Sequence, residues 1–164
     1  MTRLSDAPLL PVILGIAGLL PFVGGAIGLA LGGQWELQAA NALPVYAAVI
    51  LSFLAGGRWS AELVIRGDAP RAGVLIFAIL ISLAGWIAVP LQVWSQPGLP
   101  LNLELVGWGV LIFGFVIQYL WDRSAIRAAT FPAWYGPLRS ICTLGAVLSL
   151  CLAAFIRWSP TFSL

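Results

Sequence analysis

Five long apolar stretches, separated by short polar breaks, follow one another along this chain of 164 residues. A helix needs about 20 mostly apolar residues to cross a bilayer. Hydrophobic residues make up 61% of the chain and charged residues 9%, whereas a typical soluble domain has about 25% charged residues. We therefore expect an all-α integral membrane bundle of five transmembrane helices in one domain, 1–164. The predicted spans lie near 8–32, 42–65, 73–95, 103–122 and 138–158.

The arginines predict the orientation of this bundle, because cytoplasmic loops carry an excess of basic residues. All eight basic residues are arginines. With the N-terminus inside, seven of them fall on the inner side and only Arg157 falls outside. The two predicted outer loops, GGQWELQAAN and SQPGLPL, contain no basic residue. We expect the N-terminus inside and the C-terminus outside, in an integral membrane protein of the bacterial inner (cytoplasmic) membrane.

Composition also restricts the chemistry. The chain has no histidine, which removes the commonest metal ligand and catalytic base. Cys142 and Cys151 are nine residues apart in one predicted helix, so roughly 13 Å separates them, too far for a disulfide. The arginines form no clustered stripe of the kind that binds nucleic acid. We expect no cofactor, no metal, no nucleic-acid partner and no enzymatic activity.

The first apolar stretch contains a proline and a stripe of small residues. Pro21 removes a backbone hydrogen bond and predicts a kink in the middle of this span. Gly24, Gly28 and Gly32 recur every four residues, a pattern that lets another backbone approach closely. The stripe predicts packing against a neighbouring span of the same chain, with a homodimer contact as the alternative.

The second stretch, expected to open after Asn41 with Pro44 in its first turn, carries charges near its inner end. Arg58 and Glu62 are one helical turn apart, a spacing at which they can pair. The two residues before Arg58 are glycines, which weaken the helix or admit another backbone. They are Gly56 and Gly57.

Other polar groups are predicted at the same depth. Asp122 closes the fourth span, Gln118 precedes it by one turn, and Arg139 opens the fifth span after a stiff loop that contains Tyr135. We expect one inner-leaflet polar layer, and Arg58 has two candidate partners in it, Glu62 and Asp122. Ionisable groups inside a membrane are functional candidates by default, although paired charges can also only fix helix register. The predicted layer comprises Arg58, Glu62, Gln118, Asp122, Tyr135 and Arg139.

Three short blocks resemble a known family. ILSFLAGGRWSAEL at 50–63, QYLWDR at 118–123 and PAWYGPLRSICT at 132–143 are similar to the pattern of the domain-of-unknown-function 3429 family, small multi-pass membrane proteins similar to transmembrane protein 69. The resemblance implies the same five-span outline but no established activity. It directs attention to Gly56, Gly57, Arg58, Trp59, Asp122, Trp134, Tyr135 and Arg139.

Two functions are compatible with these features. The first is a non-catalytic accessory or assembly component that contacts other membrane proteins, further copies of itself or membrane lipids through the polar layer. The alternative is a small oligomeric transporter or channel with Arg58 and Asp122 in the translocation path. An intramembrane enzyme has less support, because no serine or thiol has an evident base beside it.

Overall fold

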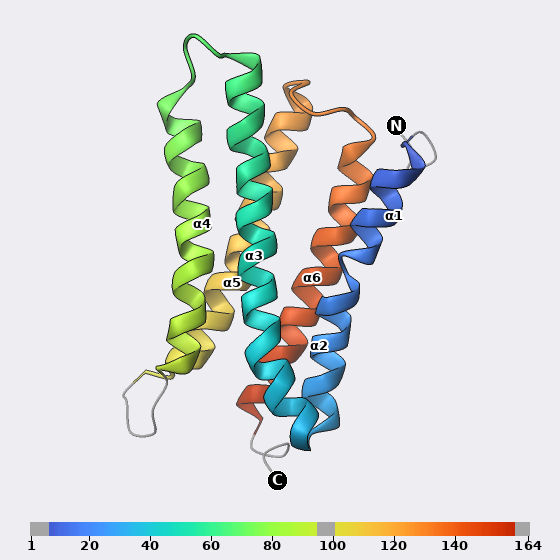
Figure 1. The fold of residues 1–164 in the computed structure, drawn as a ribbon, viewed down its shortest axis with the longest axis vertical. Coiled ribbons are helices and arrows are strands. Elements are labelled where there is room, and N and C mark those ends of the chain that lie inside the picture. The colour runs from blue at the N-terminus through green and yellow to red at the C-terminus, as the bar shows by residue number, and fades with distance from the viewer. Residues whose placement is uncertain (1–6, 95–100, 160–164) are drawn as a thin grey trace.

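The computed structural model describes residues 7–94 and 101–159, and these residues form helices and connections without a strand (Figure 1). Among them, five helical segments are long and apolar enough to cross a membrane, which confirms the predicted count. The first segment is divided into two helices. The elements are α1 (Leu9–Ala17), α2 (Leu20–Leu31), α3 (Gly33–Ile65), α4 (Ala72–Val93), α5 (Leu103–Arg127) and α6 (Tyr135–Trp158).

The break between α1 and α2 has a local cause. Pro21 lies in the first turn of α2, where a proline is tolerated, but its ring would clash with the carbonyl four residues earlier in a continuous helix. The helix therefore stops at Ala17 and restarts at Leu20. The Tyr46 hydroxyl donates to the Gly18 carbonyl over 2.8 Å, so the break is tied to α3. The predicted interruption at Pro21 is thus confirmed.

The expected start of the second span at Asn41 is wrong. The supposed outer loop GGQWELQAAN is almost entirely helical, because α3 begins at Gly33 and continues for 33 residues. At about 1.5 Å per residue this helix is roughly 50 Å long, well beyond the ~30 Å hydrocarbon core. Pro44 consequently lies inside the helix rather than in its first turn.

The remaining spans match their predicted positions with small extensions. Helix α5 starts at Leu103 as expected and continues five residues past Asp122, and α6 starts three residues before the predicted residue 138. The predicted outer loop SQPGLPL lies, except for Leu101, outside the described residues, as does Arg3. Helix α1 begins and α6 ends at opposite ends of the bundle (Figure 1), as an odd number of spans requires. Which end faces the cytoplasm stays a prediction.

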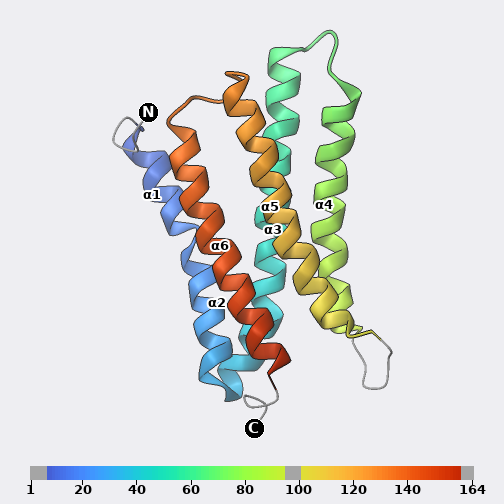
Figure 2. The same cartoon turned by 180° about the vertical axis from the view of Figure 1, so that it is seen from behind.

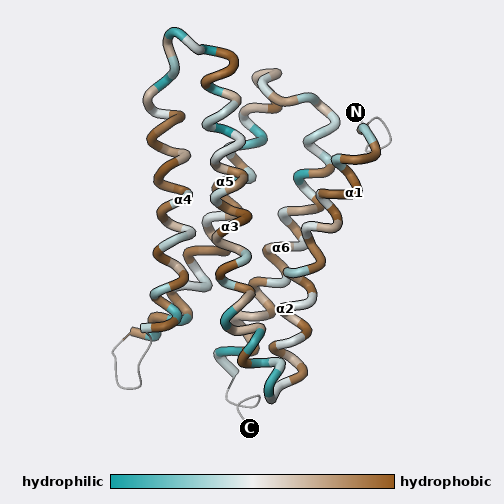
Figure 3. The backbone as a smooth tube through the Cα atoms, viewed as in Figure 1, coloured by the Kyte–Doolittle hydropathy of each residue, from teal (hydrophilic) through white to brown (hydrophobic). Residues whose placement is uncertain are grey.

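Helix α3 is the centre of the bundle. It packs against α2, α4 and α5, while α6 packs against α5 and α2 on the other side (Figures 1 and 2). Leu51, Leu111 and Phe115 are fully buried between these helices. Phe22 packs edge-on against Phe115 with ring centroids 5.5 Å apart. The middle of the bundle is therefore a packed apolar core, and most polar residues lie toward its two ends (Figure 3).

The predicted glycine stripe is only partly correct. Gly28 does pack against α3, since a Cβ atom there would lie 3.0 Å from the Ala39 Cβ, but a Cβ on Gly24 would meet nothing within 4 Å. Gly32 ends α2 with a φ of 72°, a left-handed value that favours glycine. The second close approach comes from Gly25, where a Cβ would lie 3.0 Å from Leu43. The close contact between α2 and α3 is therefore made by Gly25 and Gly28, not by Gly24 and Gly28.

Candidate functional site

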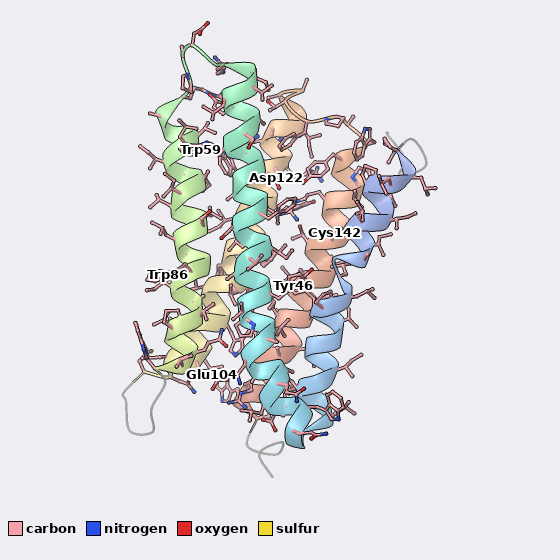
Figure 4. All side chains as sticks on the ribbon, viewed as in Figure 1. Tyr46, Trp59, Trp86, Glu104, Asp122 and Cys142 are labelled. Atoms are coloured by element: carbon pink, nitrogen blue, oxygen red, sulfur yellow. The ribbon has the colours of Figure 1, made fainter. Side chains whose placement is uncertain are left out.

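Six charged side chains gather at the end of the bundle where α3 connects to α4 and α5 to α6. Asp122 is labelled there in Figure 4. Four arginines face only two carboxylates in this group, and four of the six side chains are buried inside the bundle. We call this group the arginine-rich layer: Arg58, Glu62, Arg66, Arg71, Asp122 and Arg139.

Asp122 and Arg139 form a buried ion pair between α5 and α6. The Arg139 Nε donates to Asp122 Oδ2 over 2.7 Å, and its Nη1 donates to Thr143 Oγ1 over 3.0 Å. Gln118, one turn before Asp122, donates to the other carboxylate oxygen over 3.0 Å. Asp122 is 1% exposed and Arg139 4%. The aspartate is thus fully engaged by its own neighbours, in a low-dielectric site where such a pair is strong.

Glu62 is held by a different arginine from the one expected. Arg71, which immediately precedes α4, donates to Glu62 through its backbone N–H, its Nε and an Nη, over 2.8, 2.9 and 2.6 Å. Arg66 adds a weaker contact at 3.7 Å. These bonds raise the pKa of Arg71 above its ordinary value. Glu62 therefore closes the α3–α4 connection.

Arg58 makes no hydrogen bond or salt bridge to any described residue, so neither candidate partner, Glu62 or Asp122, forms a direct ion pair with it. Both carboxylates favour its positive charge from a longer distance, Asp122 more than Glu62. Its guanidinium lies over the Trp121 ring, 4.4 Å from the centroid, and 5.6 Å from that of Phe131. The residue is only 6% exposed, and its Nε is enclosed without an acceptor. Stacking on aromatic rings attracts a cation, but it gives the enclosed Nε of Arg58 no hydrogen-bond acceptor among the described residues.

The other predicted residues fall into two groups. Tyr135 and Trp134 lie beside the layer at the start of α6, with Tyr135 packed against the Phe131 ring at 5.3 Å, and Trp59 packs against the core. Gly56 and Gly57 are exposed, and a Cβ on either would meet nothing within 4 Å. The two glycines beside Arg58 thus pack against none of the described residues of other helices.

A second charged group lies at the opposite end and was not predicted. Arg157 on α6 donates to Glu104 on α5 and to Glu36 on α3, at 2.5 and 2.8 Å. We call these three residues the Arg157 cluster. Gln92, whose enclosed side-chain nitrogen has no partner in the part of the chain that the structure describes, lines the same cleft of about 620 Å³. The cluster is partly solvated, since the Arg157 side chain is 30% exposed.

Two unpredicted features, the Glu62–Arg71 pair and the Arg157 cluster, each have a signal in the sequence. A Gly-Asp-Ala-Pro stretch between Arg66 and Arg71 is typical of a tight turn, which brings Arg71 back to Glu62. The Arg157 cluster depends on Glu36, and Glu36 can reach Arg157 only because α3 extends to Gly33. The helix-forming residues of that extension were the available signal. Gly32 and Gly33 at its start concealed this signal, because glycine disfavours a helix.

These features define a multi-pass helical membrane protein whose most buried charges lie near one end. The family described as "Protein of unknown function (DUF3429)" matches residues 7–155, so the chain belongs to this family. It is also similar to "Transmembrane protein 69" of Xenopus tropicalis, with 32% identity over 148 residues, which is 90% of this chain and 54% of the relative. The chain thus spans about half the length of that relative. No solved structure matches the chain.

Proposed function

We propose that this protein is a non-catalytic accessory component of the membrane that binds another membrane protein through its arginine-rich layer, with Arg58 as the group that receives a partner carboxylate. The observation that carries the proposal is that Arg58 is buried yet has no acceptor among the described residues. Burying an arginine without a partner is costly. A carboxylate from a second protein would supply the missing hydrogen bonds and remove that cost.

The surface beside Arg58 supports a protein partner. Gly56, Gly57 and Ser60 are exposed on α3, and small residues on a transmembrane helix let a second helix come close enough for backbone packing. The layer also carries four arginines against two carboxylates, which favours an acidic segment at this end. The same excess supports a cytoplasmic placement of this end, in the bacterial inner membrane, as part of the proposal.

The transporter alternative has weaker support. Asp122 is occupied by Arg139 and Gln118, so it is not free to exchange partners with Arg58. Between this pair and the opposite end, the middle of the bundle is filled by fully buried apolar side chains, among them Leu51, Leu111 and Phe115. A polar path would need this core to open. Flux in proteoliposomes that is lost in Arg58→Leu would favour transport over the accessory role.

Photo-crosslinking in native membranes tests the proposal. A photoreactive residue at position 57, next to Arg58, should form a discrete adduct with one membrane protein. The matched position is Val49, exposed on the same helix nearer the opposite end, where the same residue should give no such adduct. Charge-assisted hydrogen bonds are worth about 1.5–3 kcal/mol, so Arg58→Leu should reduce the adduct about tenfold or more.

The specificity control is Arg127→Gln, which removes an exposed arginine from the same end of the bundle. It should leave the adduct unchanged. An acidic residue in the crosslinked peptide can then be changed to arginine, and Arg58→Glu should restore the adduct with that variant. Equal adducts in wild type and Arg58→Leu, or adducts with lipid only, would overturn the proposal.

A further inference from the structure

An apolar groove of about 400 Å³ lies in the half of the bundle that carries the arginine-rich layer. The α1–α2 break, α3 and α6 form its walls, and most of its lining side chains are hydrocarbon or aromatic. Leu14 and Phe53 stand at the groove and are 61% and 73% exposed. The groove therefore opens on a surface that a five-span bundle presents to lipid. Its apolar wall is made by Leu14, Leu19, Phe22, Ile50, Phe53 and Leu138.

One end of this groove is polar. Arg139 is one of the residues that line it, and its enclosed Nη2 has no hydrogen-bond partner among the described residues, although Nε and Nη1 are bonded to Asp122 and Thr143. Arg139 is the fifth residue of α6, so it lies roughly 6 Å along the helix from its first residue. An enclosed donor without an acceptor is costly. The groove thus combines a cationic side chain that has one unused donor, near the bundle end, with an apolar wall toward the middle.

This arrangement matches the phosphate and one acyl chain of a phospholipid. The volume lies within the roughly 300–1,000 Å³ range of small-ligand pockets. A lipid of the leaflet at this end places its phosphate near the bundle end and its chain toward the midplane. The excess of arginines in the layer favours a headgroup with a net negative charge.

We propose that the groove binds one acyl chain of an anionic phospholipid and that the Arg139 Nη2 donates to an oxygen of its phosphate. The proposal does not rest on the function proposed above, because Arg58 does not line the groove. A bound lipid would give the Arg139 Nη2 a hydrogen-bond acceptor and fill the space beside the α1–α2 break. Lipid binding at Arg139 and protein binding at Arg58 can therefore fail separately.

The two cysteines of α6 provide a reporter and its control. Cys142 lines the groove, whereas Cys151 is exposed and does not line it. The probe is phosphatidylglycerol, added to the purified full chain in a zwitterionic detergent, and the readout is the rate of alkylation by N-ethylmaleimide. At about ten times the dissociation constant, free protein falls to about a tenth, so Cys142 alkylation should slow about tenfold. Cys151 alkylation should not change, and phosphatidylcholine should protect Cys142 less.

Two variants separate lipid binding from folding. Arg139→Lys keeps a positive charge for Asp122 but lacks the third nitrogen, so half-maximal protection should need about tenfold more phosphatidylglycerol. Leu14→Trp fills the open side of the groove without touching the core and should have the same effect. Arg58→Leu should retain protection. Equal Cys142 rates with and without phosphatidylglycerol, protection of both cysteines alike, or full protection in both groove variants would overturn the proposal.

Discussion

Charged side chains are paired and buried differently at the two ends of the bundle. In the arginine-rich layer the Asp122–Arg139 pair is almost completely buried, whereas in the Arg157 cluster the arginine is 30% exposed and shared between two carboxylates. The solvated cluster leaves no charge of its own unpaired, while in the buried layer the enclosed Nε of Arg58 has no acceptor among the described residues. A buried unpaired charge is the costlier arrangement. Stability alone therefore accounts for the Arg157 cluster but not for Arg58.

The largest expected effect follows from removing the paired arginine of the buried layer. Arg139→Leu leaves Asp122 buried without its cation, which typically costs about 3–5 kcal/mol of unfolding free energy. Unfolding in mixed micelles measures this loss. The double variant Arg139→Leu with Asp122→Leu should recover most of it, because no isolated charge remains. A single variant as stable as wild type would contradict the buried pair.

A smaller effect is expected in the Arg157 cluster. Arg157→Gln should cost about 1 kcal/mol or less, because partly exposed pairs are screened by water and salt. The same unfolding assay checks this value. At about 1 M salt the Debye length falls to roughly 3 Å, so the difference from wild type should shrink there. Loss of stability as large as that of Arg139→Leu, unchanged by salt, would show that both ends are equally buried.

Sequence reasoning predicted the five spans and the gathering of Arg58, Asp122 and Arg139 near one end of the bundle, because both follow from hydrophobic length and the position of charged residues. It did not predict which arginine pairs with which carboxylate. The pairing of Glu62 with Arg71 depends on a turn that reverses the chain, and that of Asp122 with Arg139 on how α5 and α6 are rotated. Such rotations are set by packing between helices, which one sequence does not reveal.

The glycines show the same limit. Gly24 fits a small-residue stripe as well as Gly28 does, yet only Gly28 meets α3. Both glycines lie in α2, so the difference comes from how α2 is rotated against α3, and the spacing of residues along one helix does not fix that rotation. Gly25 replaces Gly24 at the contact. Spacing therefore identified the correct helix, but not the correct face of it.

Arg58 provides the most direct test of the comparison between the two ends. We expect that the fold does not need this side chain, so the free energy of unfolding of the purified Arg58→Leu variant in mixed micelles should be at least that of wild type. Loss of stacking on Trp121 costs on the order of 1 kcal/mol, and removal of an unpaired buried charge offsets it. A loss of about 3 kcal/mol or more, equal to that of Arg139→Leu, would show that Arg58 serves the fold and would contradict the account.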